Sequence, residues 1–85
     1  LAGNCFGDYY TRGGLDTRRR EMITLCFLAA QGGCEPQLTS HAAANMRVGN
    51  DERFLIAVVS QCTPYIGYPR TLNALRCIAD AAAKA

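Results

Sequence analysis

Residues that carry proton and thiol chemistry gather in the stretch GGCEPQLTSH, Gly32 to His41. His41 is the only histidine in the chain, and it follows Cys34 by seven residues. Pro36 suits the first turn of a helix, so Cys34 is expected at the positive end of a helix dipole, which lowers a thiol pKa and favours the reactive thiolate. The negative charge of the neighbouring Glu35 is expected to raise the thiol pKa instead. The stretch predicts either a thiol site or an ordinary loop and helix.

A carboxylate in an unusual environment is expected at Glu21. On a helix this residue shares a face with Leu25 and Leu28, so its side chain points along an apolar stripe rather than toward water. A buried acid must be paired, hydrogen-bonded or protonated. One interpretation is an ion pair, and the other is a role in moving protons. The arginines considered for the ion pair are Arg18, Arg47 and Arg53.

Three further side chains are candidates for contacts with a small-molecule substrate. Gln37 lies one helical turn before His41 and faces the same side. Tyr65 and Tyr68, in the stretch PYIGYP, would place hydroxyl groups at the mouth of a cleft, or would simply pack at a hinge. A histidine alone in a helix is more often a packing or surface residue than a catalyst. The nearby cysteine and carboxylate therefore motivate a site at His41.

Capping residues, prolines and glycines predict the elements that position these residues. The stretch NCFGDYYTRGGLD predicts a helical turn that ends at Gly13 and Gly14. Asp16 is the expected N-cap of a helix that runs to about Gln31. Further helices are expected from Pro36 to about Val48, after Asn50 or Asp51, and from Pro69 onward, with breaks at Gly49, Pro64 and Gly67. No segment shows bounded strand alternation, so the fold class is all-α.

The apolar pattern predicts which helix faces are inside. The helix that ends near Gln31 is apolar almost all round, which predicts burial in the centre or between subunits. The expected inner stripe of the third helix is Phe54, Leu55, Val58, Val59 and Cys62. The expected inner stripe of the last helix is Leu72, Leu75, Ile78 and Ala79.

Length and composition limit the classes of protein. The 85 residues suit a single domain over residues 1–85, and a chain this short buries only about 60% of its surface on folding. Yet 49% of the residues are apolar, which predicts a homo-oligomer. The net charge of +2 argues against a nucleic-acid partner, because only Arg18, Arg19 and Arg20 form a basic run. That run is expected to meet acidic partners.

No apolar stretch reaches about 18 residues, the length that a membrane span needs. The N-terminal residues also lack the charged segment followed by an apolar segment that is typical of a signal peptide. No membrane association and a cytoplasmic location are therefore expected. The chain begins at Leu1 rather than at methionine, so a segment upstream of it is also considered.

The five cysteines do not suggest a disulfide framework or a metal site. Their number is odd, and none of them forms a C-x-x-C pair. Dispersed thiols and a single histidine give no zinc spacing, so neither a metal nor another cofactor is expected. Apart from Cys34, the cysteines are interpreted as small buried apolar residues, namely Cys5, Cys26, Cys62 and Cys77.

Taken together, the segments RREMITLCFLAA and QLTSHAAANMRVGNDERFLIAVVSQCTPYIGYPRTLNALR resemble the carboxymuconolactone decarboxylase family, within the alkylhydroperoxidase D-like superfamily. The resemblance covers about residues 6 to 80. It rests on the Arg-Glu start of a buried helix, the run from His41 to Gly49, and the PYIGYP turn followed by NAL. It implies an all-helical fold with an antiparallel helical hairpin, assembled into dimers, trimers or hexamers.

The resemblance also implies roles for particular residues. The peroxidase branch uses a glutamate, a C-x-x-C pair and a histidine, which fall here on Glu21, Cys34 and His41. Gln37 occupies the position of the second cysteine, so the internal dithiol cycle of that branch is absent. A single thiol can still be oxidised to a sulfenic acid and rescued by an outside thiol.

Three functions follow as hypotheses. The first, slightly preferred because Cys34 stands in the family's reactive position, is a thiol-dependent peroxidase-like oxidoreductase in which His41 and Glu21 relay protons. The second is a cofactor-free decarboxylase or related lyase acting on a small carboxylated lactone, with His41 as the acid-base residue and Glu21 orienting it. The PYIGYP and NAL segments look closer to this decarboxylase branch. The third is a non-catalytic oligomeric scaffold that keeps the fold.

Overall fold

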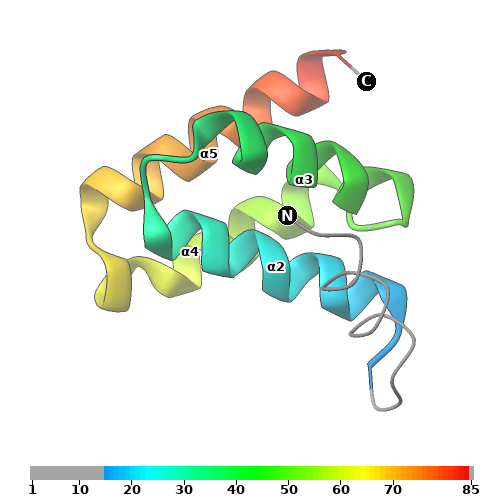
Figure 1. The fold of residues 1–85 in the computed structure, drawn as a ribbon, viewed down its shortest axis with the longest axis horizontal. Helices are drawn as coiled ribbons and strands as arrows, with labels where there is room; N and C mark the ends of the chain where they lie inside the picture. The colour runs from blue at the N-terminus through cyan, green and yellow to red at the C-terminus, as the bar shows by residue number, and fades with distance from the viewer. Residues whose placement is uncertain (1–14, 85) are drawn as a thin grey trace.

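A computed structural model describes residues 15–84, which form helices connected by short turns (Figure 1). The helices are α2 (Thr17–Gln31), α3 (Glu35–Arg47), α4 (Glu52–Ile66) and α5 (Tyr68–Lys84). No strand occurs in this part of the chain, so the all-α prediction is confirmed. None of the helices in residues 15–84 is long and apolar enough to cross a membrane. The helical turn expected at Gly13 and Gly14 lies outside the described residues.

Side-chain caps fix where α2 and α4 begin. The carboxylate of Asp16 accepts a hydrogen bond from the backbone N–H of Arg19 at 2.9 Å, as the sequence predicted. Asp51, rather than Asn50, caps α4 by accepting from the N–H of Phe54 at 2.8 Å. Such caps satisfy backbone donors that have no partner within the helix.

The end of α4 corrects one prediction. The helix continues through Pro64 to Ile66, although a break at the proline was expected. Pro64 lies in the last turn, where the missing N–H removes only the helical bond to the carbonyl of Ser60 and little helix follows to be disrupted. The stop is Gly67, whose N–H reaches the carbonyl oxygen of Thr63 at 2.9 Å.

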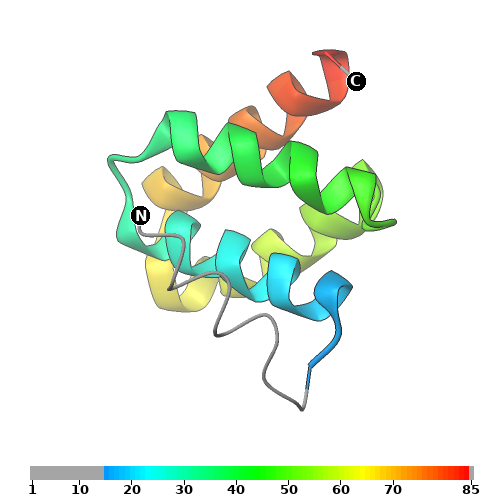
Figure 2. The same ribbon diagram turned by 45° about the vertical axis from the view of Figure 1, so that its right-hand side comes forward.

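The helices pack as two antiparallel pairs around a small core. α2 and α3 form one hairpin, and α5 lies against both α3 and α4 in the two views (Figures 1 and 2). Alanines at the contacts let the helix axes approach closely, while larger side chains fill the centre. The largest fully buried apolar side chains are Leu25, Leu38, Leu55, Val59 and Ile78.

Several expected inner positions lie on the surface instead. On α2, Phe27 is 69% exposed, so this helix is not buried all round within one chain. Phe54 on α4 and Leu72 on α5 are also exposed. The α5 face that packs inward is built largely from small residues, because it lies close against α3 and α4. Its buried members are Thr71, Ala74, Cys77, Ile78 and Ala81.

Candidate functional site

The fold brings together two of the candidates, Glu21 and His41. Glu21 lies in the first half of α2 and His41 near the middle of α3, and the hairpin places these positions side by side. The Nδ1 atom of His41 is 3.2 Å from the Oε1 atom of Glu21. The side chains are 20% and 10% exposed, respectively, so the contact is largely shielded from water. The buried acid expected at Glu21 therefore contacts an imidazole.

The Glu21–His41 contact is suited to proton transfer. An ionised Glu21 accepts a hydrogen bond from Nδ1–H, which fixes the tautomer of the imidazole and the orientation of its ring. The other ring nitrogen, Nε2, is then the atom of His41 that takes up or releases a proton. When the ring is protonated, the carboxylate also stabilises its positive charge. This is the arrangement of an acid-base residue with an orienting partner.

A buried amide holds the two backbones that carry this contact. Asn45 is 0% exposed, and its Nδ2 atom donates to the backbone carbonyl of Glu21 at 2.9 Å and to that of His41 at 2.8 Å. One side chain therefore ties α2 to α3 at the level of the pair. Because a buried amide needs such partners, its position is strongly determined.

A second asparagine extends this arrangement toward α4. The Nδ2 atom of Asn50 donates to Oδ1 of Asn45 at 2.9 Å and to the carbonyl of Arg18 at 2.8 Å. Sequence reasoning considered Asn50 only as a helix cap and missed Asn45. The signal for Asn45 was its helical spacing from Leu38 and His41, which places an amide on the packed face of α3.

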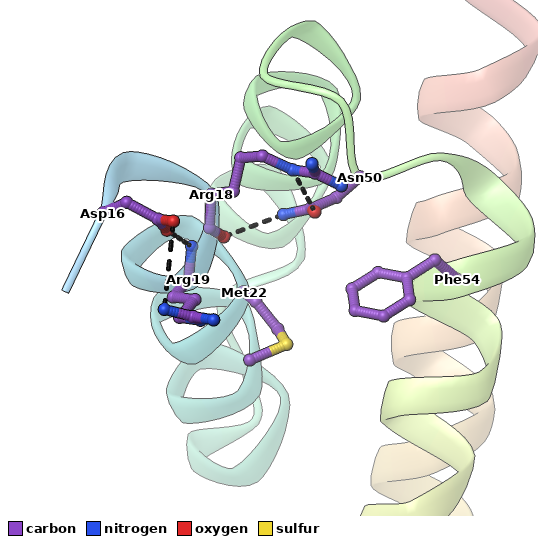
Figure 3. A pocket seen from close by; sticks show the side chains of 6 residues that line it. All are labelled: Asp16, Arg18, Arg19, Met22, Asn50 and Phe54. Carbon is purple, nitrogen blue, oxygen red and sulfur yellow. Dashed lines mark hydrogen bonds and ion pairs between the residues drawn. The ribbon is translucent and has the colours of Figure 1, made fainter.

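A cavity of about 250 Å³ opens between the first turns of α2 and α4 (Figure 3). Met22 and Phe54 extend into it from the two helices, and Arg18 lies beside Asn50 at one end. Arg18 donates to the carbonyl oxygen of Gly49 at 3.3 Å. Neither Glu21 nor His41 is among its lining residues, which are Asp16, Arg18, Arg19, Met22, Asn50 and Phe54.

Within the arginine run that opens α2, Arg19 meets an acidic partner, as expected. Arg19 lies 4.0 Å from the carboxylate of Asp16, and both side chains are largely exposed. An exposed ion pair of this kind contributes little to stability. Arg18 instead contacts Asn50, with 3.4 Å between Nε and Oδ1, and so belongs to the polar connection between α2 and α4.

Cys34 lies immediately before α3, and its environment differs from the expectation. Burial, the charge of Glu35 and the thiol of Cys77, in that order, raise the pKa of Cys34 above the usual value for a thiol. The prediction that the helix dipole would lower this pKa was therefore wrong. Desolvation favours the neutral thiol, which donates a hydrogen bond to the carbonyl oxygen of Leu28 at 3.2 Å.

The structure separates Cys34 from the acid-base pair. His41 follows Cys34 by seven positions along α3 and its N-cap, which corresponds to about 10 Å of helix rise. Gln37, expected to face the same side as His41, has an exposed side chain. The thiol thus lies at one end of the α2–α3 hairpin, and the pair lies near its middle.

The two candidate tyrosines lie on the outside of the chain. Tyr65 is 88% exposed near the end of α4, and Tyr68 is 72% exposed at the start of α5. Neither is among the residues that line the cavity between α2 and α4. Their role in substrate contact stays a prediction.

The other described cysteines fall into two kinds. Cys77 is buried and donates to the carbonyl of Glu35 at 3.6 Å, in agreement with its interpretation as a small core residue. Cys26 and Cys62 are only half-buried, and they face one another. Within residues 15–84, no group of three or more histidine, cysteine, aspartate or glutamate side chains is arranged to hold a metal ion.

Comparison of the whole chain with known families places it in one of them. The model of the carboxymuconolactone decarboxylase family matches residues 1–80. The chain therefore belongs to the carboxymuconolactone decarboxylase family, and the resemblance in its sequence is confirmed. The four described helices agree with the all-α fold of such proteins. No curated protein matches the chain.

Proposed function

We propose that this chain is a cofactor-free acid-base enzyme that removes a carboxylate from a small carboxylated lactone. His41 moves the proton, and Glu21 orients and stabilises the imidazole. The observation that carries the proposal is the 3.2 Å contact between Nδ1 of His41 and Oε1 of Glu21, largely shielded from water between α2 and α3. Membership of the carboxymuconolactone decarboxylase family supports this class of substrate.

The reaction requires one proton transfer at carbon. The bond between the carboxylate and the ring carbon breaks, carbon dioxide leaves, and the electron pair stays on the lactone, where it delocalises toward the lactone carbonyl. Nε2–H of protonated His41 then delivers a proton to that carbon. The carboxylate of Glu21 holds Nδ1–H throughout and stabilises the imidazolium before the transfer. Water restores the proton on His41.

The thiol-dependent peroxidase is the alternative, and Cys34 is its critical residue. Peroxide reduction needs a thiolate, whereas the surroundings of Cys34 favour the neutral thiol by raising its pKa. The position of Cys34, about two helical turns from His41, also leaves it without a close proton relay in that pair. These features support the proposal of a lyase over that of a peroxidase. In the third alternative, the non-catalytic scaffold, the pair would serve only stability.

The test is an assay of decarboxylation with a γ-carboxylated muconolactone as substrate. Turnover is measured as the release of carbon dioxide. We expect His41→Ala to lower kcat by about 100-fold or more, because it removes the group that transfers the proton. Glu21→Gln keeps the shape of the side chain but removes the charge that stabilises the imidazolium, so a smaller loss is expected. The matched control is Cys34→Ser, which should retain turnover.

The same four proteins are then assayed with an organic hydroperoxide and a thiol reductant. Hydroperoxide turnover that disappears in Cys34→Ser, together with no lactone turnover by the unaltered protein, would support the peroxidase instead. If neither substrate is turned over and the variants change only thermal stability, the scaffold alternative is favoured. Circular dichroism of each variant separates loss of chemistry from loss of fold.

A further inference from the structure

Two thiols outside the candidate site face each other across the α2–α4 contact. The Sγ atoms of Cys26 and Cys62 are 4.0 Å apart, although 36 positions separate the residues in the sequence. Cys62 also lies 3.6 Å from the carbonyl oxygen of Val58, one turn earlier on α4. Both cysteines are free and only half-buried. The acid-base chemistry proposed above uses neither of them.

The spacing of packed helices is compatible with a bond between these sulfur atoms. Helix axes in contact lie about 8–10 Å apart, and Cα atoms lie about 2.3 Å from each axis. Facing Cα atoms are then about 3.4–5.4 Å apart, which overlaps the range of about 4.4–6.8 Å found across disulfides. The sulfur atoms must approach by about 2 Å to reach bonding distance, a movement that side-chain rotation can supply.

We propose that Cys26 and Cys62 are a peroxide-oxidisable dithiol that closes to a disulfide joining α2 to α4. One sulfur, as a thiolate, attacks the O–O bond of a hydroperoxide, which gives a sulfenic acid and releases an alcohol. The second sulfur attacks the sulfenic sulfur, the S–O bond breaks, and water leaves. The two thiols together lose two electrons and two protons, and the hydroperoxide is reduced to an alcohol and water.

The surroundings of the pair make this a slow reaction at neutral pH. Burial, followed by the charge and the hydrogen bond of Cys62, raises the pKa of Cys26 to about 11. Few thiolates are therefore present until the solution is alkaline, so oxidation near neutral pH requires abundant oxidant. Cys34 and Cys77 donate to the backbone carbonyls of Leu28 and Glu35, as Cys62 does to that of Val58. The 4.0 Å contact between the sulfur atoms of Cys26 and Cys62 is therefore the observation that favours this pairing.

The bond would also change the stability of the chain. It would close a loop across 36 sequence positions and so restrict the unfolded state more than the folded one. The oxidised protein should therefore melt at a higher temperature than the reduced protein, by about 5 °C or more for a domain of this size. α2 carries Glu21, so this restraint acts on an element of the candidate site.

The experiment exposes the unaltered protein to tert-butyl hydroperoxide and maps its cysteines under non-reducing conditions. Combined trypsin and chymotrypsin cleave after Phe27 and separate Cys26 from Cys34. We expect a linked peptide pair containing Cys26 and Cys62, lighter by two hydrogen atoms than the separate peptides. Dithiothreitol should release the pair, and the melting temperature should fall on reduction.

Three variants provide the controls, and all five cysteines are mapped in each. Cys26→Ser and Cys62→Ser should each abolish the linked peptide, whereas Cys34→Ser should retain it, because the pair does not depend on the candidate site. The proposal is overturned if Cys26 and Cys62 remain thiols while other cysteines are oxidised, if they bond to other cysteines or between chains, or if the linked form melts at a lower temperature than the reduced form. None of these outcomes bears on the lactone assay.

Discussion

At the residue scale, the contact between Glu21 and His41 depends on a third side chain, Asn45, which is not part of that contact. Glu21 and His41 belong to different helices, so their 3.2 Å contact requires α2 and α3 to keep one rotation and one axial shift. Asn45 fixes both, because its amide group donates to the backbone of each residue. The acid-base pair is thus positioned by an amide that packs where an apolar residue would otherwise be expected.

This arrangement predicts that Asn45→Ala lowers the free energy of unfolding by about 1–3 kcal/mol, because it removes hydrogen bonds that are buried in the folded chain. Urea unfolding followed by circular dichroism measures the effect. The matched control is Gln37→Ala, an exposed change on the same helix, for which a difference within about 0.5 kcal/mol is expected. Equal effects of the two substitutions would contradict the role given to Asn45.

The raised pKa of Cys34 gives a prediction about pH. A thiol with a raised pKa keeps its proton to higher pH, so Cys34 in the folded chain should react with iodoacetamide more slowly at pH 8 than in the urea-unfolded chain. Its rate should also continue to rise at pH values where the unfolded control has levelled off. Peptide mass spectrometry measures both rates. Faster alkylation in the folded chain would restore Cys34 as an activated nucleophile.

Residue types alone led to Glu21, Cys34 and His41, but only the fold shows which of them meet. Glu21 was expected to be buried with a polar partner because it interrupts an apolar stripe, and its burial is confirmed. Its contact with His41 depends on the alignment of two helices, which spacing within either helix does not encode. The prediction of a lowered pKa at Cys34 failed for a related reason, because burial and neighbouring groups outweigh the local helix dipole.

At the scale of elements, the turns depend on glycines in a conformation closed to other residues. Gly32 and Gly67 end α2 and α4 with φ of 73° and 84°, and both have ψ of 162°. This combination differs from the left-handed helical region that asparagine tolerates, and it is essentially restricted to glycine. In both turns, this glycine therefore helps to set the direction of the next helix.

Gly67→Ala should lower the free energy of unfolding by about 1–3 kcal/mol through backbone strain alone. A Cβ atom at this position would lie 3.8 Å from Cδ of Pro69, an ordinary contact, so no steric clash adds to the loss. Gly67→Asn should be no more stable than Gly67→Ala. Asparagine tolerates left-handed helical dihedrals, but that tolerance does not extend to the ψ of this position. Thermal denaturation of both variants tests this, and recovery of stability with asparagine would contradict it.

Helix positions were easier to predict than helix faces. The start of α2 at the Asp16 cap and its end at Gln31 follow from local chemistry, and the structure confirms them. The inner face of α5 could not be predicted from local chemistry in this way. Small residues such as Ala74 and Cys77 pack inward, while Leu72 is exposed. Hydrophobicity measures only the gain from leaving water. It does not distinguish the face that meets the core from one that meets a second chain.

At the scale of the whole molecule, one chain leaves much apolar surface uncovered. Its core contains few large apolar side chains, whereas several other large apolar side chains remain exposed. A surface of this kind on a small protein indicates contact with another molecule. Within residues 15–84, the exposed large apolar residues are Leu15, Phe27, Phe54, Ile56, Tyr65, Tyr68 and Leu72.

We therefore predict that the chain forms a homo-oligomer, a trimer or a hexamer, and that Phe27 contributes to its interface. Phe27→Glu should convert the assembly to smaller species because a carboxylate would replace an apolar contact, yet the helical content should persist because the position is 69% exposed in one chain. Size-exclusion chromatography with light scattering measures the mass. The matched control is Glu52→Gln, an exposed polar change that should leave the mass unaltered. A monomeric unaltered protein would contradict the prediction, and the exposed apolar face of α2 would then need another partner.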